Sequence, residues 1–272
     1  MDKILESNLE SSLENNIESG LENNLESNLE NNLESNFESN LQELGIVLSI
    51  EQKEQFANFY EMLIEYNKVM NLTSITERLE VYSKHFIDSL SLCRLVELGA
   101  TKGPKRVIDI GTGAGFPGIP LKIAFPELEI VLLDSLNKRV KFLNAVIKKL
   151  KLQGIKAIHG RAEEMAKQKE YREAFDIGVS RAVSKLSVLS EYCIPYIRVG
   201  GIFISYKSGL IDEELKESKK AISILGGKID AIDKFQLIGT DMGRSLVKIQ
   251  KERSTPKKYP RKAGTPAKEP LR

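Results

Sequence analysis

The chain has 272 residues and a formal charge of +2; 41% of its residues are hydrophobic, and it contains two cysteines. This hydrophobic share is large enough to bury a core, which excludes a wholly disordered chain, and two cysteines exclude a disulfide scaffold and a multi-cysteine zinc module. Neither a signal-peptide pattern nor an apolar run of about 18 residues is visible, so we expect a cytoplasmic protein without membrane contact.

An acidic repeat fills residues 1–40, which contain ten acids and one base and carry a net charge of −9. Residues 41–272 carry the opposite charge, +11, from 39 bases and 28 acids. Within the repeat, apolar residues recur at every fourth position, a period that drifts by about 40° per repeat around an α-helix. Because no face stays apolar, we expect a mostly disordered or frayed helical extension rather than a partner-binding helix.

A helical lead-in is predicted over residues 41–100. Ser49 and Gln52 have the spacing of a capping box, and Phe56, Phe59 and Leu63 follow at helical intervals. A second helical pattern runs roughly over residues 78–98. These two patterns predict a small helical subdomain ahead of the next part of the chain.

Short apolar runs alternate with helical patterns over residues 101–250. Such alternation is typical of a parallel sheet with helices on both faces, and the last two runs, which lack a helix between them, predict a closing antiparallel hairpin. We therefore expect an α/β fold with a mostly parallel, seven-stranded sheet and a terminal antiparallel strand. The predicted strands are Arg106–Ile110, Glu129–Asp134, Lys156–His159, Phe175–Ser180, Gly201–Tyr206, Ala231–Leu237 and Ser245–Gln250.

Three glycines follow the first predicted strand at alternate positions, Gly111, Gly113 and Gly115. Glycines let the backbone turn sharply and bring free N–H groups close to a ligand. A dinucleotide pattern G-x-G-x-x-G would need its third glycine at Phe116, whereas Asp109 followed by these three glycines is the pattern of S-adenosyl-L-methionine (SAM) methyltransferases. We expect SAM as the cofactor, with a nucleotide cofactor and a purely structural turn as alternatives.

Further candidate site residues lie where other predicted strands end. Asp134 ends the second strand, where doubly wound folds place a carboxylate against ribose hydroxyls, although a solvated acid is also common there. Arg181 follows the fourth strand, where it is expected to contact the cofactor carboxylate or a target phosphate. The two histidines, His85 and His159, lack a cluster of ligands around them, so we expect no metal site. His85 is either a packing residue at the edge of the helical lead-in or an RNA or active-site contact.

The last segment, residues 251–272, carries eight bases and two acids and is expected to be an extended basic tail. Its bases are suited to neutralising phosphates, and the tyrosine among them to stacking on a nucleotide base. A solvated terminus is the alternative. The candidate RNA-binding residues of the tail are Lys257, Lys258, Tyr259, Arg261 and Lys262.

A specific resemblance covers roughly residues 45–272. Its motifs occur in family order: Met70–Thr73, His85–Leu90, Gly111–Pro120, Leu132–Ser135, Gly160–Glu163, Ser180–Val183, Arg244–Leu246 and Lys258–Pro266. Together they resemble the RsmG (GidB) family, and the acidic repeat is a departure from its pattern. The resemblance implies a Rossmann-like class I SAM-dependent methyltransferase that modifies guanine N7 in the 530 loop of 16S rRNA. It also implies SAM contacts at Gly111, Phe116, Ala162, Glu163 and Arg181.

The predicted chemistry needs no general base, because guanine N7 has an in-plane lone pair and no proton at neutral pH. Catalysis then consists of proximity and alignment, so no catalytic residue is assigned beyond a positioning role for Arg181. The expected partner is 16S rRNA or the small ribosomal subunit, and we expect a monomer. A SAM-dependent methyltransferase that acts on another RNA, a nicotinamide-dependent oxidoreductase and a non-enzymatic RNA-binding protein are the alternatives.

Overall fold

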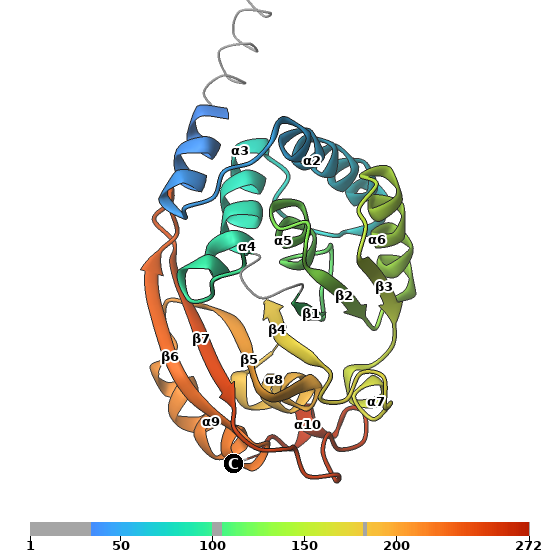
Figure 1. The fold of residues 1–272 in the computed structure, drawn as a ribbon, viewed down its shortest axis with the longest axis vertical. Coiled ribbons are helices and arrows are strands. Elements are labelled where there is room, and N and C mark those ends of the chain that lie inside the picture. The colour runs from blue at the N-terminus through green and yellow to red at the C-terminus, as the bar shows by residue number, and fades with distance from the viewer. Residues whose placement is uncertain (1–33, 100–104, 182–183, 272) are drawn as a thin grey trace, which may run out of the picture.

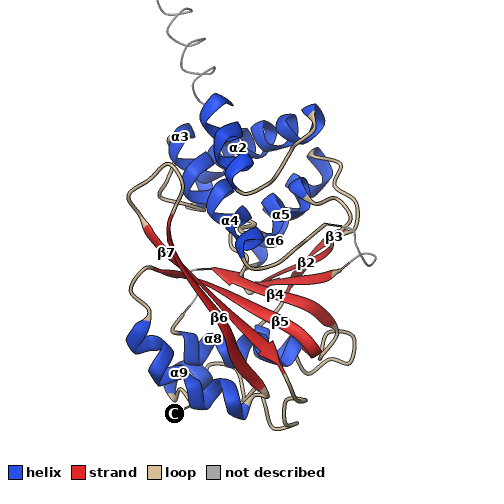
Figure 2. Ribbon diagram, turned by 60° about the vertical axis from the view of Figure 1, so that its left-hand side comes forward, coloured by secondary structure: helices blue, strands red, loops and turns tan. Residues whose placement is uncertain are grey.

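The computed structural model describes residues 34–99, 105–181 and 184–271, which form a central sheet between two layers of helices (Figures 1 and 2). The seven strands lie in the order β3-β2-β1-β4-β5-β7-β6. Strands β1 to β5 pair in parallel, whereas β7 is antiparallel to both of its neighbours, β5 and β6. This arrangement confirms the predicted mostly parallel sheet and its closing hairpin.

Burial along the strands reflects their positions in the sheet. Central strands β1 and β2 are buried at every residue after the first, as expected where helices cover both faces. After its buried first residue, edge strand β6 alternates between exposed and partly buried residues, because successive side chains point to opposite faces of the sheet and one of these faces is exposed to water. The strands are β1 (Arg106–Ile110), β2 (Glu129–Asp134), β3 (Ile155–His159), β4 (Phe175–Arg181), β5 (Ile197–Ser208), β6 (Gly227–Gln236) and β7 (Gly243–Lys251).

Helices cover the two faces of the sheet with separate apolar cores. The first layer contains α2 (Ile50–Met70), α3 (Arg78–Val81), the π-helix η1 (Tyr82–Ile87), α4 (Asp88–Leu90), the 3₁₀-helix η2 (Ser91–Arg94), α5 (Gly118–Ala124) and α6 (Asn137–Lys149). The second contains α7 (Ala162–Met165), α8 (Leu186–Cys193), the 3₁₀-helix η3 (Ile194–Tyr196), α9 (Asp212–Ile224) and α10 (Thr265–Lys268). None of the described helices is long and apolar enough to cross a membrane.

The helical lead-in is built into the first layer. Ser49 and Gln52 form the predicted capping box at the start of α2. The Gln52 side-chain amide also donates to the carbonyl of Ile123 at the end of α5, at 2.7 Å, and Gln55 donates to the carbonyl of Leu150 beyond α6, at 3.0 Å. These bonds satisfy carbonyl groups that helix ends leave without an intrahelical partner. The lead-in therefore shares one core with the sheet.

The folded body begins earlier than residue 41. Residues 34–43 are helical, and Phe37 is 6% exposed. Its ring packs edge-on against Phe56 and Tyr82, with centroid distances of 5.4 and 4.9 Å. The end of the acidic repeat is thus ordered by aromatic packing that its four-residue period did not predict. The rest of the repeat, residues 1–33, lies outside the described residues.

Candidate functional site

The glycine loop that follows β1 has the backbone geometry its sequence requires. Gly111, Gly113 and Gly115 have positive φ angles of 71°, 63° and 95°, a region that side chains strongly disfavour. The amide of Gly111 donates to the carbonyl of Leu133 in β2 at 2.9 Å, and the Gly113 amide donates to a carboxylate oxygen of Asp134 at 2.9 Å. The loop is therefore held against the carboxyl end of β2.

Space around the glycines differs in a way that fits a ligand. A Cβ atom at Gly113 would meet only the Gly111 carbonyl oxygen, at 4.0 Å. A Cβ at Gly115 would lie 2.5 Å from Ile119, and one at Gly118 would lie 2.3 Å from Leu132. Gly115 and Gly118 thus allow close packing within the protein, whereas Gly113 borders open space. The loop accordingly fits a cofactor that approaches the backbone at Gly113.

Asp109 holds the two ends of the glycine loop together. Its fully buried carboxylate accepts hydrogen bonds from the Thr112 hydroxyl at 2.6 Å and from the Gly118 amide at 2.9 Å. Burial raises the pKa of Asp109 to about 7, although both hydrogen bonds favour the charged form. This acid, recognised in the sequence only as part of the glycine pattern, links the start of the loop to the start of α5.

Asp134 has a structural task in addition to the ribose contact expected for it. One carboxylate oxygen accepts from Gly113, and the other accepts from the Leu136 amide at 2.8 Å. The Arg139 guanidinium lies 3.5 Å away. Each carboxylate oxygen has two lone pairs, so these contacts leave acceptor capacity for a ligand. Asp134 therefore shapes the glycine loop, and its ribose contact stays a prediction.

Ala162 and Glu163 are the first two residues of the short helix α7 and form a turn that follows the carboxyl end of β3. The Gly160 amide, two residues earlier, donates to the Asp134 carbonyl at 3.0 Å. The Tyr196 hydroxyl donates to the Ala162 carbonyl at 2.7 Å. The Glu163 side chain is 5% exposed and points into the protein. Both residues of this predicted cofactor contact therefore follow within three positions of the backbone amide that is bonded to Asp134.

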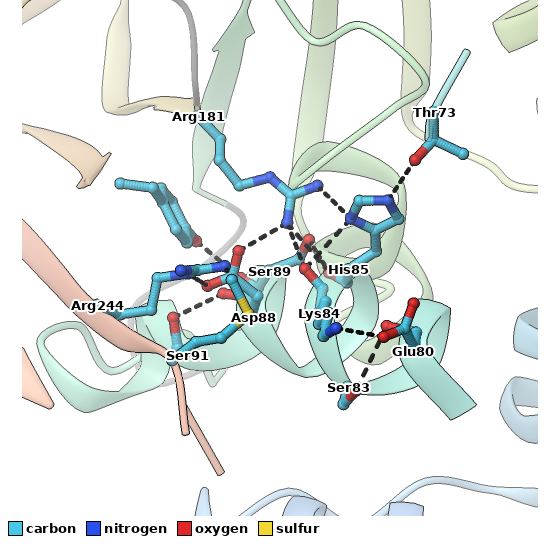
Figure 3. A network of polar contacts seen from close by, with 12 residues as sticks. Thr73, Glu80, Ser83, Lys84, His85, Asp88, Ser89, Ser91, Arg181 and Arg244 are labelled. Atoms are coloured by element: carbon cyan, nitrogen blue, oxygen red, sulfur yellow. Dashed lines mark hydrogen bonds and ion pairs between the residues drawn. The ribbon is translucent and has the colours of Figure 1, made fainter. Parts of the chain in front are cut away.

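A polar network joins Arg181 to the helical layer (Figure 3). The Arg181 guanidinium donates to the Asp88 carboxylate at 2.8 Å and lies over the Phe116 ring, 4.9 Å from its centroid. Arg244, at the start of β7, donates to the other carboxylate oxygen of Asp88 at 3.1 Å. The network lies directly beside the glycine loop, because Phe116 follows Gly115.

His85 lies within the same network. Its Nδ1 atom lies 3.3 Å from Arg181 and 3.2 Å from the Lys84 carbonyl oxygen, and its Nε2 atom lies 2.8 Å from the Thr73 hydroxyl. The imidazole stacks on Phe116 at a centroid distance of 4.6 Å. Burial, followed by the positive charge of Arg181, lowers the pKa of His85 to about 3. The imidazole is therefore neutral at physiological pH.

A pocket of about 410 Å³ opens beside the network. Four cationic side chains line it: Lys84, Arg181, Lys207 and Arg244. Lys84 pairs with Glu80, and Lys207 pairs with Glu214 at 2.6 Å. The terminal nitrogens of Arg244, in contrast, make only long protein contacts among the described residues, at 3.4 and 3.9 Å. The pocket thus offers guanidinium donors to an anionic ligand.

Among the pocket residues, sequence reasoning assigned a role only to His85 and Arg181. Asp88 and Arg244 belong to motifs of the family resemblance, but their motifs do not indicate that they meet. Lys207 carries no motif signal at all. Residue spacing alone does not reveal such a cluster, because its members come from a helix and from the ends of β5 and β7.

The expectation of an extended C-terminal tail is wrong. Tyr259 is 7% exposed, and Arg261 forms a bidentate ion pair with Glu191 of α8. The tail therefore packs on the second helical layer, where α10 lies beside α8 (Figure 1). Composition predicted exposure because the tail is basic, but a buried carboxylate in α8 binds one of its bases. Three predicted RNA-binding residues do stay exposed: Lys257, Lys258 and Lys262.

Groups suited to metal binding are not clustered in the part of the chain that the structure describes. No three His, Cys, Asp or Glu side chains there lie close enough together to hold a metal ion. The two cysteines, Cys93 and Cys193, are free thiols, one partly and one fully buried.

Known proteins resemble this chain over most of its length. The family model GidB, rRNA small subunit methyltransferase G, matches residues 52–239. Ribosomal RNA small subunit methyltransferase G of Lachnoclostridium phytofermentans is 53% identical over 85% of this chain and 94% of that protein. Its counterpart from Desulforamulus reducens is 54% identical over 85% and 95% of the two chains.

Solved structures share the fold at much lower identity. A putative sarcosine dimethylglycine methyltransferase from Galdieria sulphuraria aligns with a TM-score of 0.53 at 11% identity, covering 74% of this chain and 98% of that chain. This likeness confirms the class I methyltransferase fold, while the family match confirms an enzyme with SAM as its cofactor. The family match also excludes the oxidoreductase alternative. The chain belongs to the GidB family, rRNA small subunit methyltransferase G.

Proposed function

We propose that this protein transfers the methyl group of SAM to N7 of a guanine in the 530 loop of 16S rRNA, in the small ribosomal subunit of the cytoplasm. The observation that carries the proposal is the position of the basic pocket. It lies at the carboxyl ends of β4 and β5, where α/β folds bind ligands. Arg181, which lines the pocket, also packs on the ring of Phe116 in the glycine loop.

Residues of this chain are suited to hold the cofactor on the glycine-loop side. The backbone at Gly113 borders open space, and Asp134 and the Leu133 carbonyl hold the loop in place by accepting the amides of Gly113 and Gly111. Ala162 and Glu163 form the neighbouring turn. When bound, SAM supplies an electrophilic methyl group attached to a positively charged sulfur.

The side chains of the pocket suit an acceptor that needs no deprotonation. His85 is a weak base, because burial and Arg181 lower its pKa to about 3. The Asp88 carboxylate is engaged by two guanidinium groups. Guanine N7 presents a lone pair without a proton, so neither residue has to accept one. The protein's contribution is then to orient the guanine, which is proximity catalysis.

RNA recognition follows from the cations of the pocket. Arg244 presents terminal nitrogens with only long protein contacts, and a guanidinium binds phosphate oxygens in bidentate fashion. Lys84 and Lys207 add positive charge at the pocket wall. The target guanine must leave its stack to reach the methyl group. We therefore assign the phosphate of the flipped nucleotide to Arg244.

The test maps N7-methylguanosine in 16S rRNA from a strain that lacks this protein and from strains complemented with the wild type or with Gly113→Arg. The wild type is expected to restore methylation in the 530 loop, whereas Gly113→Arg, which fills the open space at the loop, is not. Methylation that persists in the deletion strain overturns the proposal. Loss at a different guanine instead supports the alternative of another RNA site.

A further inference from the structure

The C-terminal tail is anchored to the protein at several points. The Arg172 guanidinium donates to the carbonyls of Thr255 at 2.8 Å and Tyr259 at 2.9 Å. The Tyr259 ring is 7% exposed and belongs to the apolar core between the sheet and the second helical layer. These contacts involve backbone carbonyls and an aromatic ring, so they fix the path of the tail's backbone and do not depend on its charged side chains.

The strongest anchor joins Arg261 to Glu191. Arg261 donates from Nε to Oε1 at 3.0 Å and from Nη2 to Oε2 at 2.7 Å, and its backbone amide donates to Oε1 at 2.8 Å. The Glu191 side chain is only 1% exposed. A bidentate pair on a buried carboxylate fixes both the position and the orientation of the guanidinium. Arg261 is therefore attached rigidly to α8.

Three residues beyond this anchor, the tail reaches the predicted cofactor turn. The Gly264 amide donates to Oε1 of Glu163 at 2.9 Å. Gly264 has a φ of +83°, a conformation that favours glycine and aims this amide at the carboxylate. On the adjacent residue, the Tyr196 hydroxyl holds the Ala162 carbonyl at 2.7 Å. The turn is thus braced by two contacts, of which one comes from the tail.

We propose that the tail is a positioning strap for the cofactor site: Arg261, acting through Gly264 and Glu163, holds the Ala162–Glu163 turn in the geometry that binds the adenosine of SAM. The inference rests on the proposed function, in which this turn is part of the cofactor site. It assigns Arg261 to positioning of the cofactor site, in place of the RNA contact that the basic composition predicts, and gives a role to Gly264, for which the sequence predicts none. Both are positioning residues, because each acts through Glu163.

The test measures the dissociation constants of SAM and of 5′-methylthioadenosine, which shares the adenosine but lacks the amino acid, by calorimetry on the full chain. Arg261→Ala is expected to weaken both ligands by the same factor, about tenfold, equivalent to about 1.4 kcal/mol. Lys268→Ala, which removes an exposed charge from the same tail, is the matched control and is expected to bind both ligands like the wild type. Binding is measured well below the melting temperature of each variant.

Two further measurements separate positioning from general stability. Gly264→Ala keeps the Arg261 anchor, strains only the backbone at the donor amide, and is expected to weaken both ligands as well. In a double-mutant cycle, the effects of Arg261→Ala and Glu163→Ala on SAM affinity are expected to be strongly non-additive. Glu163→Ala removes the acceptor of the Gly264–Glu163 hydrogen bond, and Arg261→Ala releases the tail that positions its donor.

A lower melting temperature with unchanged SAM affinity in Arg261→Ala overturns the strap, and so does an additive cycle. Lost RNA affinity with intact SAM affinity overturns it in favour of an RNA-binding tail. A wild-type protein that binds neither ligand refutes the cofactor site itself, which separates failure of the proposed function from failure of the strap alone.

Discussion

The Arg181 guanidinium donates to the Asp88 carboxylate at 2.8 Å, across 93 residues of sequence. Asp88 is 3% exposed and accepts from Arg244 as well, at 3.1 Å. One buried carboxylate thus connects the end of β4, the start of β7 and helix α4. By lying between the two guanidinium groups, it compensates part of the repulsion that would otherwise push them apart.

Replacing Asp88 with Ala is expected to destabilise the protein by about 3 kcal/mol, because two partly buried guanidinium groups lose their shared partner. Urea unfolding measures this loss. Asp230→Ala serves as the control, since it breaks a pair between Lys248 and a half-exposed carboxylate and is expected to cost less than about 1 kcal/mol. Equal losses in the two variants would contradict a structural role for the Asp88 bridge.

The sheet and the glycine loop were predictable because their signals are local. Alternation of short apolar runs with helical patterns specifies parallel strands, and glycines at alternate positions specify a loop with positive φ angles. Even the closing hairpin followed from the absence of a helix between two runs. The residues concerned lie within a few positions of one another in the sequence, so spacing alone captures their geometry.

The pocket and the tail were not predictable in this way. Asp88 meets Arg244 across 156 residues, and Arg261 meets Glu191 across 70. No periodicity links such pairs, because each contact depends on how helices pack against the sheet. For the same reason, a basic composition indicated an exposed tail although Glu191 offered a buried partner. The charge of a side chain favours its exposure to water, whereas the presence of a buried partner of opposite charge depends on the tertiary fold.

The glycines of the loop are expected to separate binding from stability. Gly113→Ala places a methyl group in open space, at a φ of 63°, and should lower SAM affinity at least tenfold for a stability loss of about 1 kcal/mol. Gly118→Ala places its methyl 2.3 Å from Leu132 and 2.9 Å from Asp109, and should cost about 3 kcal/mol.

Calorimetric SAM titration and urea unfolding of both variants check this contrast. A Gly113→Ala protein that binds SAM as tightly as the wild type would show that the open space beside this residue does not belong to the cofactor site.

Neither cysteine is expected to act as a nucleophile. Burial raises the pKa of the Cys93 thiol to about 12 and that of Cys193 well above its ordinary value, so almost no thiolate exists at neutral pH. Iodoacetamide at pH 8 should therefore leave both thiols unmodified in the native protein and alkylate both in urea, as mass spectrometry can measure. The double variant Cys93→Ala/Cys193→Ala should keep its methyltransferase activity. Rapid alkylation of the folded protein would contradict the expected lack of thiolate. An inactive double variant that still binds SAM would indicate that a cysteine takes part in catalysis.

The stability of the protein should fall in mild acid because of His85. The unfolded chain protonates this histidine near its ordinary pKa of about 6.5, whereas burial and Arg181 lower the pKa to about 3 in the folded protein. Between these values the unfolded state binds more protons, so acidification favours unfolding. From pH 7.5 to 5.5, His85 alone should remove about 1 kcal/mol of the unfolding free energy.

Urea unfolding of the wild type and of His85→Gln at both pH values measures this contribution. Glutamine has no titrating group and retains a side-chain acceptor and donor, so the variant should lose less stability than the wild type over the same range. A second readout is the chemical shift of the His85 ring protons, which should not titrate between pH 8 and 5 in the folded protein. Titration near pH 6.5 would show that Arg181 and Phe116 do not hold the imidazole in its neutral form.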